Sequence, residues 1–346
     1  MNTAIAVGSA YYNGEQWNDL VEFTQQADRQ GVDYAWSAEA WGMDSIVPLA
    51  YLAGKTQNIK LGTGILQISS RVPPMIAMTA QSMATVSDDR FILGLGVSGP
   101  QVVEGLHGQS FAKPLSRLRE CIDIIKMGLN GDRVQYQGKH YQLPRAGGEG
   151  KPIRLSQPPR PNLPIYLATL GPKALELTGE LADGWLGTSF IPEYADVFLD
   201  PIRRGAEKAG RSLEDIDIQI GGSIEVGEDV EAMIAARKPG MAFTLGGMGS
   251  ANTNFYNSAF RRSGYADVAE EVQALWVAGK KSQAIARVPD ELILKTSLIG
   301  TEDMIRERLR AYKNAGVNTF RIGAEGDNLQ QKLDRLGISL DLIRSV

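Results

Sequence analysis

Short apolar runs alternate along the chain with longer stretches in which apolar residues recur every three or four positions. The short runs predict buried strands, and the longer stretches predict amphipathic helices. Eight strands are predicted on this basis: Ala4–Val7, Tyr34–Ser37, Ile59–Ile65, Phe91–Val97, Ile165–Ala168, Gly184–Gly187, Ile216–Val226 and Thr319–Ile322. Strands this apolar, with helices between them, are typical of a parallel sheet that is covered on both faces.

Start and stop signals support the helices between these strands. Pro73 and Pro74 open a helix that is predicted to run to Val86, because proline fits the first helical turn. Thr301 can cap a helix that is predicted to reach Ala315, where Gly316 follows. The remaining predicted helices are Trp17–Gln30, Ile46–Thr56, Leu115–Met127, Pro172–Ala182, Tyr194–Ala209 and Asn328–Ile343.

The alternation is interrupted at 128–164 and again at 229–299. The first segment is rich in glycine and proline, and we expect it to pack over the rim of the sheet. The second is expected to be irregular, with helices around Phe255–Ser263 and Val268–Ala278. Eight strands in roughly 300 residues favour a (β/α)8 TIM barrel over a doubly wound sheet. We therefore predict a single TIM-barrel domain over 1–346, with insertions at about 128–164 and 229–299.

Composition narrows the classes of function. The 346 residues are 43% hydrophobic and 22% charged, which allows a sizeable core. A net charge of −4 gives no general attraction to nucleic acid. The amino terminus has no basic segment and no run reaches 18 apolar residues, so we expect a cytoplasmic protein with no membrane partner.

The cysteine and histidine content argues against metal and disulfide chemistry. Cys121 is the single cysteine, so neither an intrachain disulfide nor a multi-cysteine metal site can form, and we expect it to act as a small buried hydrophobe. The two histidines, His107 and His140, are not spaced as metal ligands, so no metal is expected. His140 is expected at the surface, and His107 follows the loop of the fourth strand.

Candidate chemistry collects where the predicted strands end. The third strand runs through Gly64 and stops in the polar residues 69–71, and a glycine before a branched residue can carry a backbone kink beneath a flat ring. Active sites in parallel α/β folds lie at such ends. Glu39 follows the second strand, with Trp41 beside it as an apolar wall. The G-x-G-x-x-G pattern of residues 94–99 follows the fourth strand instead of the first, so it indicates a loop close to a ligand better than a dinucleotide fingerprint.

Four segments together resemble the bacterial-luciferase-like superfamily, and within it the branch that uses the deazaflavin coenzyme F420. They are Asp33–Trp36, Ile59–Ile65, Thr178–Trp185 and Gly205–Ser212, and Arg287–Glu291 with Val317–Asn318 fits the same class. The likeness covers nearly the whole chain and is close to methylene-tetrahydromethanopterin reductase.

The resemblance implies a TIM barrel, a non-prolyl cis peptide at Gly64–Ile65, and a deazaflavin ring bent by contact with Ile65. The cofactor-binding residues that it implies are Glu39, Gly64, Ile65, Gln67, Ser98, Gly99, Pro100, Gln101, Ala168, Thr169, Leu170 and Gly171. Of these, 168–171 would meet the cofactor tail at a helix N-terminus. Glu39 and Gln101 are the expected catalytic residues, and Trp41, Glu104, His107 and Phe190 are expected to contact substrate.

The chain departs from the sugar-phosphate dehydrogenases of this branch. Those enzymes carry an Asp-His pair at the end of the second strand, and the corresponding residues in this chain are Glu39 and Ala40. The glutamate in their loop after the fourth strand is Gln101 here. Their phosphate-binding lysine is replaced in this chain within Phe190–Pro192. Sugar-phosphate oxidation is therefore disfavoured. We expect hydride transfer to an unsaturated or iminium-like acceptor, with Glu39, helped by Gln101 or Glu104, orienting or protonating the substrate.

Two alternatives stay open: an FMN-dependent luciferase-like monooxygenase, and a cofactor carrier without catalysis. The family likeness suggests a folate-like carrier as substrate, whereas Trp41, Phe190 and the loop at 246–254 suggest a larger, partly aromatic or lipidic one. A homodimer is expected because symmetric dimers are the default for such enzymes.

Overall fold

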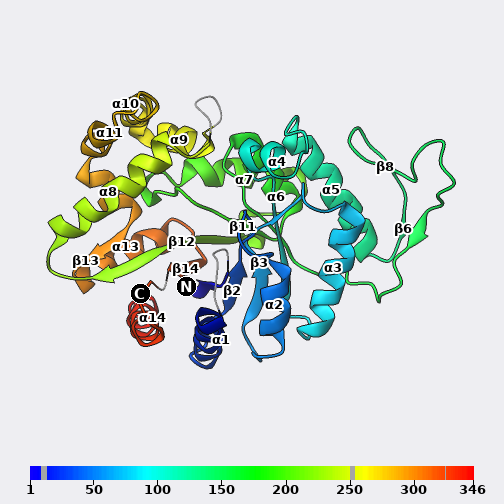
Figure 1. Ribbon diagram of the computed structural model, residues 1–346, viewed down its shortest axis with the longest axis horizontal. Coiled ribbons are helices and arrows are strands. Elements are labelled where there is room, and N and C mark those ends of the chain that lie inside the picture. The colour runs from blue at the N-terminus through cyan, green and yellow to red at the C-terminus, as the bar shows by residue number, and fades with distance from the viewer. Residues whose placement is uncertain (9–13, 250–253, 324) are drawn as a thin grey trace. The chain divides into compact units, whose positions relative to one another are not determined.

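The computed structural model describes residues 1–8, 14–249, 254–323 and 325–346 (Figure 1). The chain forms two compact units, which are described here separately. The N-terminal unit comprises Ala6–Ala168 and Leu181–Gly184. The C-terminal unit comprises Met1–Ile5, Thr169–Glu180 and Trp185–Val346.

Parallel strands build the N-terminal unit. β3 (Lys60–Thr63) pairs with β2 (Tyr34–Ser37) on one side and with β5 (Phe91–Gly96) on the other, and β5 also pairs with β10 (Ile165–Leu167). β4 (Leu66–Gln67) runs beside the end of β5. The predicted third strand is thus interrupted at residues 64–65. The helices of this unit are α1 (Gly14–Arg29), α2 (Ile46–Ala53), α3 (Pro73–Val86), α4 (Pro100–Gly105) and α5 (Pro114–Leu129).

The C-terminal unit is arranged around the long strand β12 (Asp217–Val226). Its first half pairs with β14 (Thr319–Gly323), which in turn pairs with β1 (Asn2–Ala6). The second half of β12 pairs with β13 (Leu298–Gly300). Gly187, which follows β11 (Gly184–Leu186), donates its N–H to the carbonyl of Gln219 in β12. The flanking helices are α6 (Pro172–Leu181), α7 (Asp196–Lys208), α13 (Glu302–Asn314) and α14 (Leu329–Arg344).

The segment that the sequence predicts to be irregular, 229–299, is mostly helical. It contains α8 (Val230–Gly246), α9 (Phe255–Phe260), α10 (Ala266–Val277), α11 (Lys281–Arg287) and α12 (Asp290–Thr296). Pro239 lies inside α8, and this breaker next to Gly240 hides the helical pattern in the sequence. β13 was also missed, because its three residues are too few to show a period.

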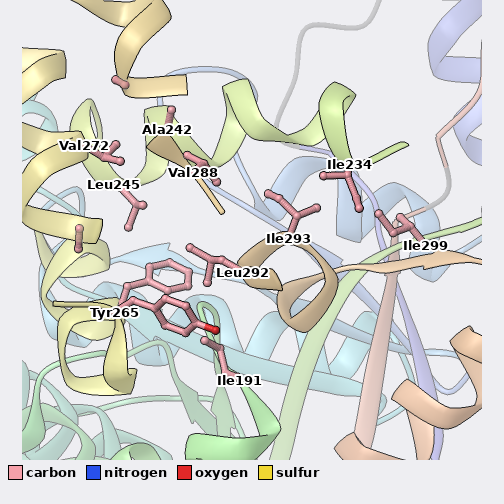
Figure 2. Packing of buried hydrophobic residues seen from close by; sticks show 13 residues of the cluster. Ile191, Ile234, Ala242, Leu245, Tyr265, Val272, Val288, Leu292, Ile293 and Ile299 are labelled. Atoms are coloured by element: carbon pink, nitrogen blue, oxygen red, sulfur yellow. The ribbon is translucent and has the colours of Figure 1, made fainter. Parts of the chain in front are cut away.

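The helices of this segment pack around a core of their own. Leu245 of α8, Val272 of α10 and Leu292 of α12 point toward one another (Figure 2). Ile191, which follows β11, and Ile299 of β13 join the same cluster. Of the loop at 246–254, residues 250–253 lie outside the described part of the chain.

The insertion at 128–164 holds two small antiparallel pairs, shown beyond α5 in Figure 1. They are β6 (Arg133–Val134) with β9 (Ile153–Arg154), and β7 (Tyr136–Gln137) with β8 (Gln142–Leu143). The segment is fastened to α5 through Glu120 and to α3 through a bond from Gln157 to Ser82. The predicted position over the rim of the sheet is therefore revised to a position against these two helices.

Two buried carboxylates accept backbone N–H groups from segments distant in sequence. Asp28 accepts from residues 57–59, and Glu120 accepts from residues 139–141, at distances of 2.7–3.1 Å. Burial alone would raise both pKa values, but the three N–H groups around each carboxylate, with Arg90 near Asp28, hold the pKa of each below its ordinary value. Each carboxylate therefore stabilises the fold in its ionised form.

Acid is expected to destabilise the protein through these two groups. A carboxylate with a lowered folded-state pKa contributes stability above its unfolded pKa of about 4, and the contribution is lost as the pH falls through the folded value. Asp28→Asn and Glu120→Gln should each lower stability at neutral pH by about 1–3 kcal/mol and flatten the decline between about pH 5 and pH 3. Thermal melts across this range test the prediction. Asp303→Asn, at a side chain that is 96% exposed, is the control and should change neither quantity.

Cys121 is fully buried, as expected, and burial raises the pKa of its thiol to about 12. Within the described ranges no helix is long and apolar enough to cross a membrane. Among the same residues, no group of three or more histidine, cysteine, aspartate or glutamate side chains is placed to hold a metal ion.

Candidate functional site

In the N-terminal unit, the loop after β2 is joined to the segment between β3 and β4. Gly64 donates its N–H to the carbonyl of Ser37 at 2.7 Å, and Glu39 donates its N–H to the carbonyl of Ile65 at 3.1 Å. The peptide bond between Gly64 and Ile65 is cis. A β carbon at Gly96 would lie 2.9 Å from Ile65 Cγ1, so the neighbouring strand needs glycine at this point. The ends of β2, β3 and β5 thus form one packed platform.

The carboxylate of Glu39 lies at the centre of a polar network on this platform. Arg71 Nη1 donates to both carboxylate oxygens at 2.8 Å. Ser70 Oγ donates to Oε1 at 2.8 Å and Ser45 Oγ to Oε2 at 3.1 Å. Arg71 also pairs with Asp44. The side chains of Glu39 and Arg71 are only 10% and 20% exposed, so the pair is largely withdrawn from solvent, and the carboxylate oxygens already accept four hydrogen bonds from the protein.

Gln67 connects this network to His107. Gln67 Nε2 donates to the carbonyl oxygens of Glu39 and Ala40, at 2.9 and 3.1 Å. These two bonds fix the orientation of the amide, so its Oε1 is an acceptor. His107 Nε2 lies 3.2 Å from that oxygen and is therefore the donor, which leaves Nδ1 as the acceptor of the neutral ring. The structure thus brings His107 to the Glu39 network.

The loop after β5 carries further residues that the sequence singles out. Ser98 has a φ of +59°, a left-handed conformation that few residues other than glycine adopt, and Gly99 precedes the first turn of α4. Gln101 and Glu104 lie on α4 and are exposed, and Glu104 Oε1 accepts the N–H of Phe111 at 3.1 Å. Trp41 is 79% exposed. These three side chains make no contact with the Glu39 network among the described hydrogen bonds.

The predicted tail-binding segment begins at Ala168, whose N–H donates to Leu95 in the N-terminal unit. The rest lies in the C-terminal unit. Thr169 bonds to Thr178 at 2.7 Å and accepts a bond from Trp185 Nε1 at 2.9 Å. The Gly171 carbonyl accepts the N–H groups of 174 and 175, so α6 begins here. The segment is therefore held rigidly just before a helix N-terminus.

Arg262 extends to this segment from the turn between α9 and α10. Its Nη2 donates to the carbonyl of Leu170 at 2.7 Å and its Nη1 to Ser258 Oγ at 3.1 Å. Its Nε is buried without a partner in the described structure, and burial lowers the pKa of the guanidinium. A positive group with an unused donor thus lies beside the residues that precede α6, where anions are favoured.

The C-terminal unit also contains a cavity of about 500 Å³. Its polar lining includes Thr188, Ser189 and Ser223, and its apolar lining includes Phe190 and Phe260. Ser189 has a φ of +55°, so the backbone turns sharply after β11. A volume of this size suits a small organic molecule. Phe190, a predicted substrate contact, is buried against Trp185 and Phe198 and also lines the cavity.

Sequence reasoning found Glu39 but missed the side chains that bind it. In the sequence, Arg71 could be recognised only as part of the polar end of the third strand. No sequence pattern near Arg71 indicates that it pairs with Glu39. Ser70 belongs to the same polar strand end, whereas Ser45 and Arg262 carried no motif signal. His140, expected at the surface, is partly buried with an unpartnered Nε2 among the described residues.

Comparison with known proteins gives a consistent result. The family model described as luciferase-like monooxygenase matches residues 1–319. A putative coenzyme F420-dependent oxidoreductase of Mycobacterium tuberculosis is 38% identical, over 91% of this chain and 93% of the relative. A 5,10-methylenetetrahydromethanopterin reductase of Archaeoglobus fulgidus is 28% identical, over 93% of this chain and 94% of the relative.

The solved structures show the fold. The coenzyme F420-dependent tetrahydromethanopterin reductase of Methanopyrus kandleri superposes with a TM-score of 0.76 at 23% identity, covering 97% of each chain. The likeness shows a (β/α)8 TIM barrel of the luciferase-like type, and the fold class predicted from the sequence is thereby confirmed.

Proposed function

The chain belongs to the luciferase-like monooxygenase family, and from that premise we propose that it is a coenzyme F420-dependent oxidoreductase, transferring a hydride between the deazaflavin and an organic substrate. The observation that carries the proposal is the relative at 38% identity over 91% of this chain, which is itself described as a coenzyme F420-dependent oxidoreductase. An FMN-dependent monooxygenase is the second candidate. It has less support, because two of the proteins compared above are described with a cofactor, and in both cases that cofactor is F420.

The finer likeness to methylenetetrahydromethanopterin reductase rests on 28% identity, so it guides the choice of acceptor without fixing the substrate. No histidine base stands at Ala40, which disfavours the oxidation of alcohols and sugar phosphates. The acceptor is proposed to be a carbon–carbon or carbon–nitrogen double bond that takes up a hydride and a proton.

The chain's own residues fit a deazaflavin with an anionic tail. In the N-terminal unit, Gly64, Ile65, Gln67 and the 98–101 loop would hold the ring, on a platform that Gly96 keeps free of a side chain. Residues 169–171 would bind an anionic group at the N-terminus of α6, with the unused Nε of Arg262 as donor. When bound, the deazaflavin would supply two-electron hydride chemistry with little reactivity toward oxygen.

Within the Glu39 network the roles divide according to the hydrogen bonds. Because the Glu39 oxygens already accept four bonds, we assign Glu39 to orientation: it fixes Arg71 and, through its carbonyl, the amide of Gln67. Gln67 Oε1 then holds the Nε2–H of His107. Nδ1 of His107 is left to hold the proton that accompanies the hydride.

Replacing His107 should separate catalysis from cofactor binding. His107→Gln is expected to lower kcat by about 10–100-fold, since the proton donor is lost, and to leave F420 affinity unchanged. His140→Gln, which changes the histidine of the insertion at 128–164, should leave both quantities unchanged. Steady-state kinetics and F420 titration of the two variants test the assignment. Equal kcat in wild type and His107→Gln would remove His107 from the mechanism.

Replacing Arg262 should weaken cofactor binding. Arg262→Gln is expected to raise the Kd for F420 by about tenfold, because a charged hydrogen bond contributes about 1.5–3 kcal/mol. Arg261→Gln, one residue earlier, removes an arginine that pairs with Glu270 at the surface and should have no effect. Fluorescence titration of both proteins makes the comparison, and similar affinities would refute the role of Arg262.

The activity itself is tested by mixing the protein with reduced F420 and a panel of enones and imines, with and without oxygen. Protein-dependent oxidation of F420 that requires an acceptor and is indifferent to oxygen supports the proposal. Turnover that requires reduced FMN and consumes oxygen would favour the monooxygenase instead.

We also propose that the protein is a homodimer. Exposed apolar side chains gather on α2 and α3, which pack against each other: Val47, Tyr51, Met75 and Met78. A second copy is the simplest partner for such a face. Sedimentation should give a dimer for the wild type and a monomer for Met78→Glu.

A further inference from the structure

Glu325 is the acidic residue among the described residues that line the cavity of about 500 Å³ in the C-terminal unit. Ser223 Oγ donates to Glu325 Oε1 at 2.8 Å. Ser223 and Gly323 are register partners on β12 and β14, and a β carbon at Gly323 would lie 2.8 Å from Ser223 Oγ. Glycine at this position therefore leaves room for the hydroxyl group, and the pairing of the two strands places one oxygen of the carboxylate at the cavity.

The two arginines of this region do not neutralise Glu325. Arg237, which also lines the cavity, pairs with Glu225 at 2.8 Å. Arg321 of β14 donates to the carbonyl of Gly187. Within the described ranges neither arginine forms an ion pair with Glu325, and Glu325 Oε2 has no hydrogen-bond partner. The negative charge at the cavity is therefore left to be matched by a bound molecule.

The charge of Glu325 lies at the mouth of the cavity, and aromatic side chains lie deeper. Glu325 is exposed, whereas Phe190, Phe260 and Tyr312 line the same cavity and are buried. An ion at the mouth keeps part of its water, so it avoids most of the desolvation cost of a buried ion pair. An apolar group in the cavity gains from leaving water. The arrangement therefore suits a molecule with an apolar body and a positive end.

We propose that the cavity binds a substrate with a protonated amine, which donates to the carboxylate of Glu325, and an apolar body, which lies beside Phe190 and Phe260. This inference rests on the proposed function, of which it names the substrate class. An ammonium group has three donors and no acceptor. It can therefore bond to the open oxygen of Glu325 and also to the hydroxyl group of Ser189, which lines the cavity. A carboxylate or a phosphate ester would be repelled by Glu325.

Thermal melts of the full chain test the proposal with phenethylammonium chloride as the probe and sodium chloride at equal ionic strength as the blank. The probe should raise the Tm of the wild type, because a ligand that binds only the folded state stabilises it. Phenethyl alcohol has the same apolar body without the charge. It should bind about fivefold more weakly, as expected from the loss of one partly exposed ion pair. Hydrocinnamate, which carries the opposite charge, should bind more weakly still.

Glu325→Gln should bind phenethylammonium about fivefold more weakly than the wild type and bind phenethyl alcohol equally well. Because Glu325 is exposed, the variant should fold with nearly the same ligand-free Tm. Glu270→Gln is the matched control, since it removes a glutamate of the same unit that pairs with Arg261 at the surface, and it should respond like the wild type. The proposal is overturned if Glu325→Gln keeps full affinity for phenethylammonium, or if either of the other two probes binds the wild type as tightly.

Titration with F420 separates this inference from the proposed function. Unchanged F420 affinity in Glu325→Gln supports a role toward substrate, whereas lost affinity would assign Glu325 to the cofactor and overturn the inference. If the wild type binds no F420 but binds phenethylammonium in a way that depends on Glu325, the proposed function fails and the amine site stands. If F420 binds and phenethylammonium does not, the inference fails and the proposed function stands.

Discussion

An Arg71→Met variant is expected to lose about 3–5 kcal/mol of stability, because it leaves the carboxylate of Glu39 buried without its partner. In the wild type Arg71 contacts both carboxylate oxygens at 2.8 Å, and the side chain of Glu39 is only 10% exposed. The variant should also have little turnover, because Glu39 holds the loop that positions Gln67. Urea unfolding gives the loss of stability, and F420-dependent kinetics give the loss of activity.

The double variant Arg71→Met/Glu39→Leu distinguishes folding from function. Removing both charges should restore most of the stability, since replacing a whole buried ion pair by apolar groups is often neutral. It should not restore turnover. Glu39→Gln is expected to lower turnover even with F420 bound. The account would be wrong if Glu39→Gln kept full turnover, or if the double variant were no more stable than Arg71→Met.

A Gly205→Ala substitution is expected to destabilise the protein by about 3 kcal/mol, because a β carbon there overlaps the backbone of a neighbouring helix. Gly205 lies on α7, and its β carbon would meet the carbonyl oxygen of Glu176 on α6. Gly179 on α6 faces the carbonyl of Ile202 on α7 in the same way. The two helices can therefore approach this closely only with glycine at both positions.

Gly337→Ala is the matched control for this prediction. Gly337 lies inside α14, and a β carbon there would have no neighbour within 4 Å. The substitution should stabilise the protein by about 1 kcal/mol, since alanine is the better helix former. Thermal or urea unfolding of the two variants measures both effects. Equal effects at the two positions would contradict the packing argument.

The glycine pair also explains two of the segments that revealed the family. Thr178–Trp185 and Gly205–Ser212 resemble known relatives, yet Gly179 and Gly205 bring α6 and α7 together and touch no candidate chemistry. The resemblance was thus partly a signal of helix packing.

The strands were predictable because each is a short buried run, and all eight are present with shifts of a few residues at most of their ends. The exceptions have local causes. The third predicted strand is interrupted at Gly64 and Ile65, and Pro239 hides the helix α8. β13 is recognisable only through its pairing with β12, which is not a local property.

The candidate site was predictable only in part, for the same reason. Glu39 could be found because it follows a strand end. Its partner Arg71 follows a different strand, and only the fold brings the two together. Arg262 and Arg321 each have a buried Nε with no hydrogen-bond partner among the described residues. Such a missing partner depends on the folded surroundings and cannot be predicted from the sequence.

The central claim is that this chain uses coenzyme F420, and a side-by-side titration of the purified protein with F420 and with FMN tests it most directly. Deazaflavin fluorescence should show binding of F420 in the micromolar range or tighter, with much weaker binding of FMN. Preferential binding of FMN would contradict the account and point to monooxygenase chemistry.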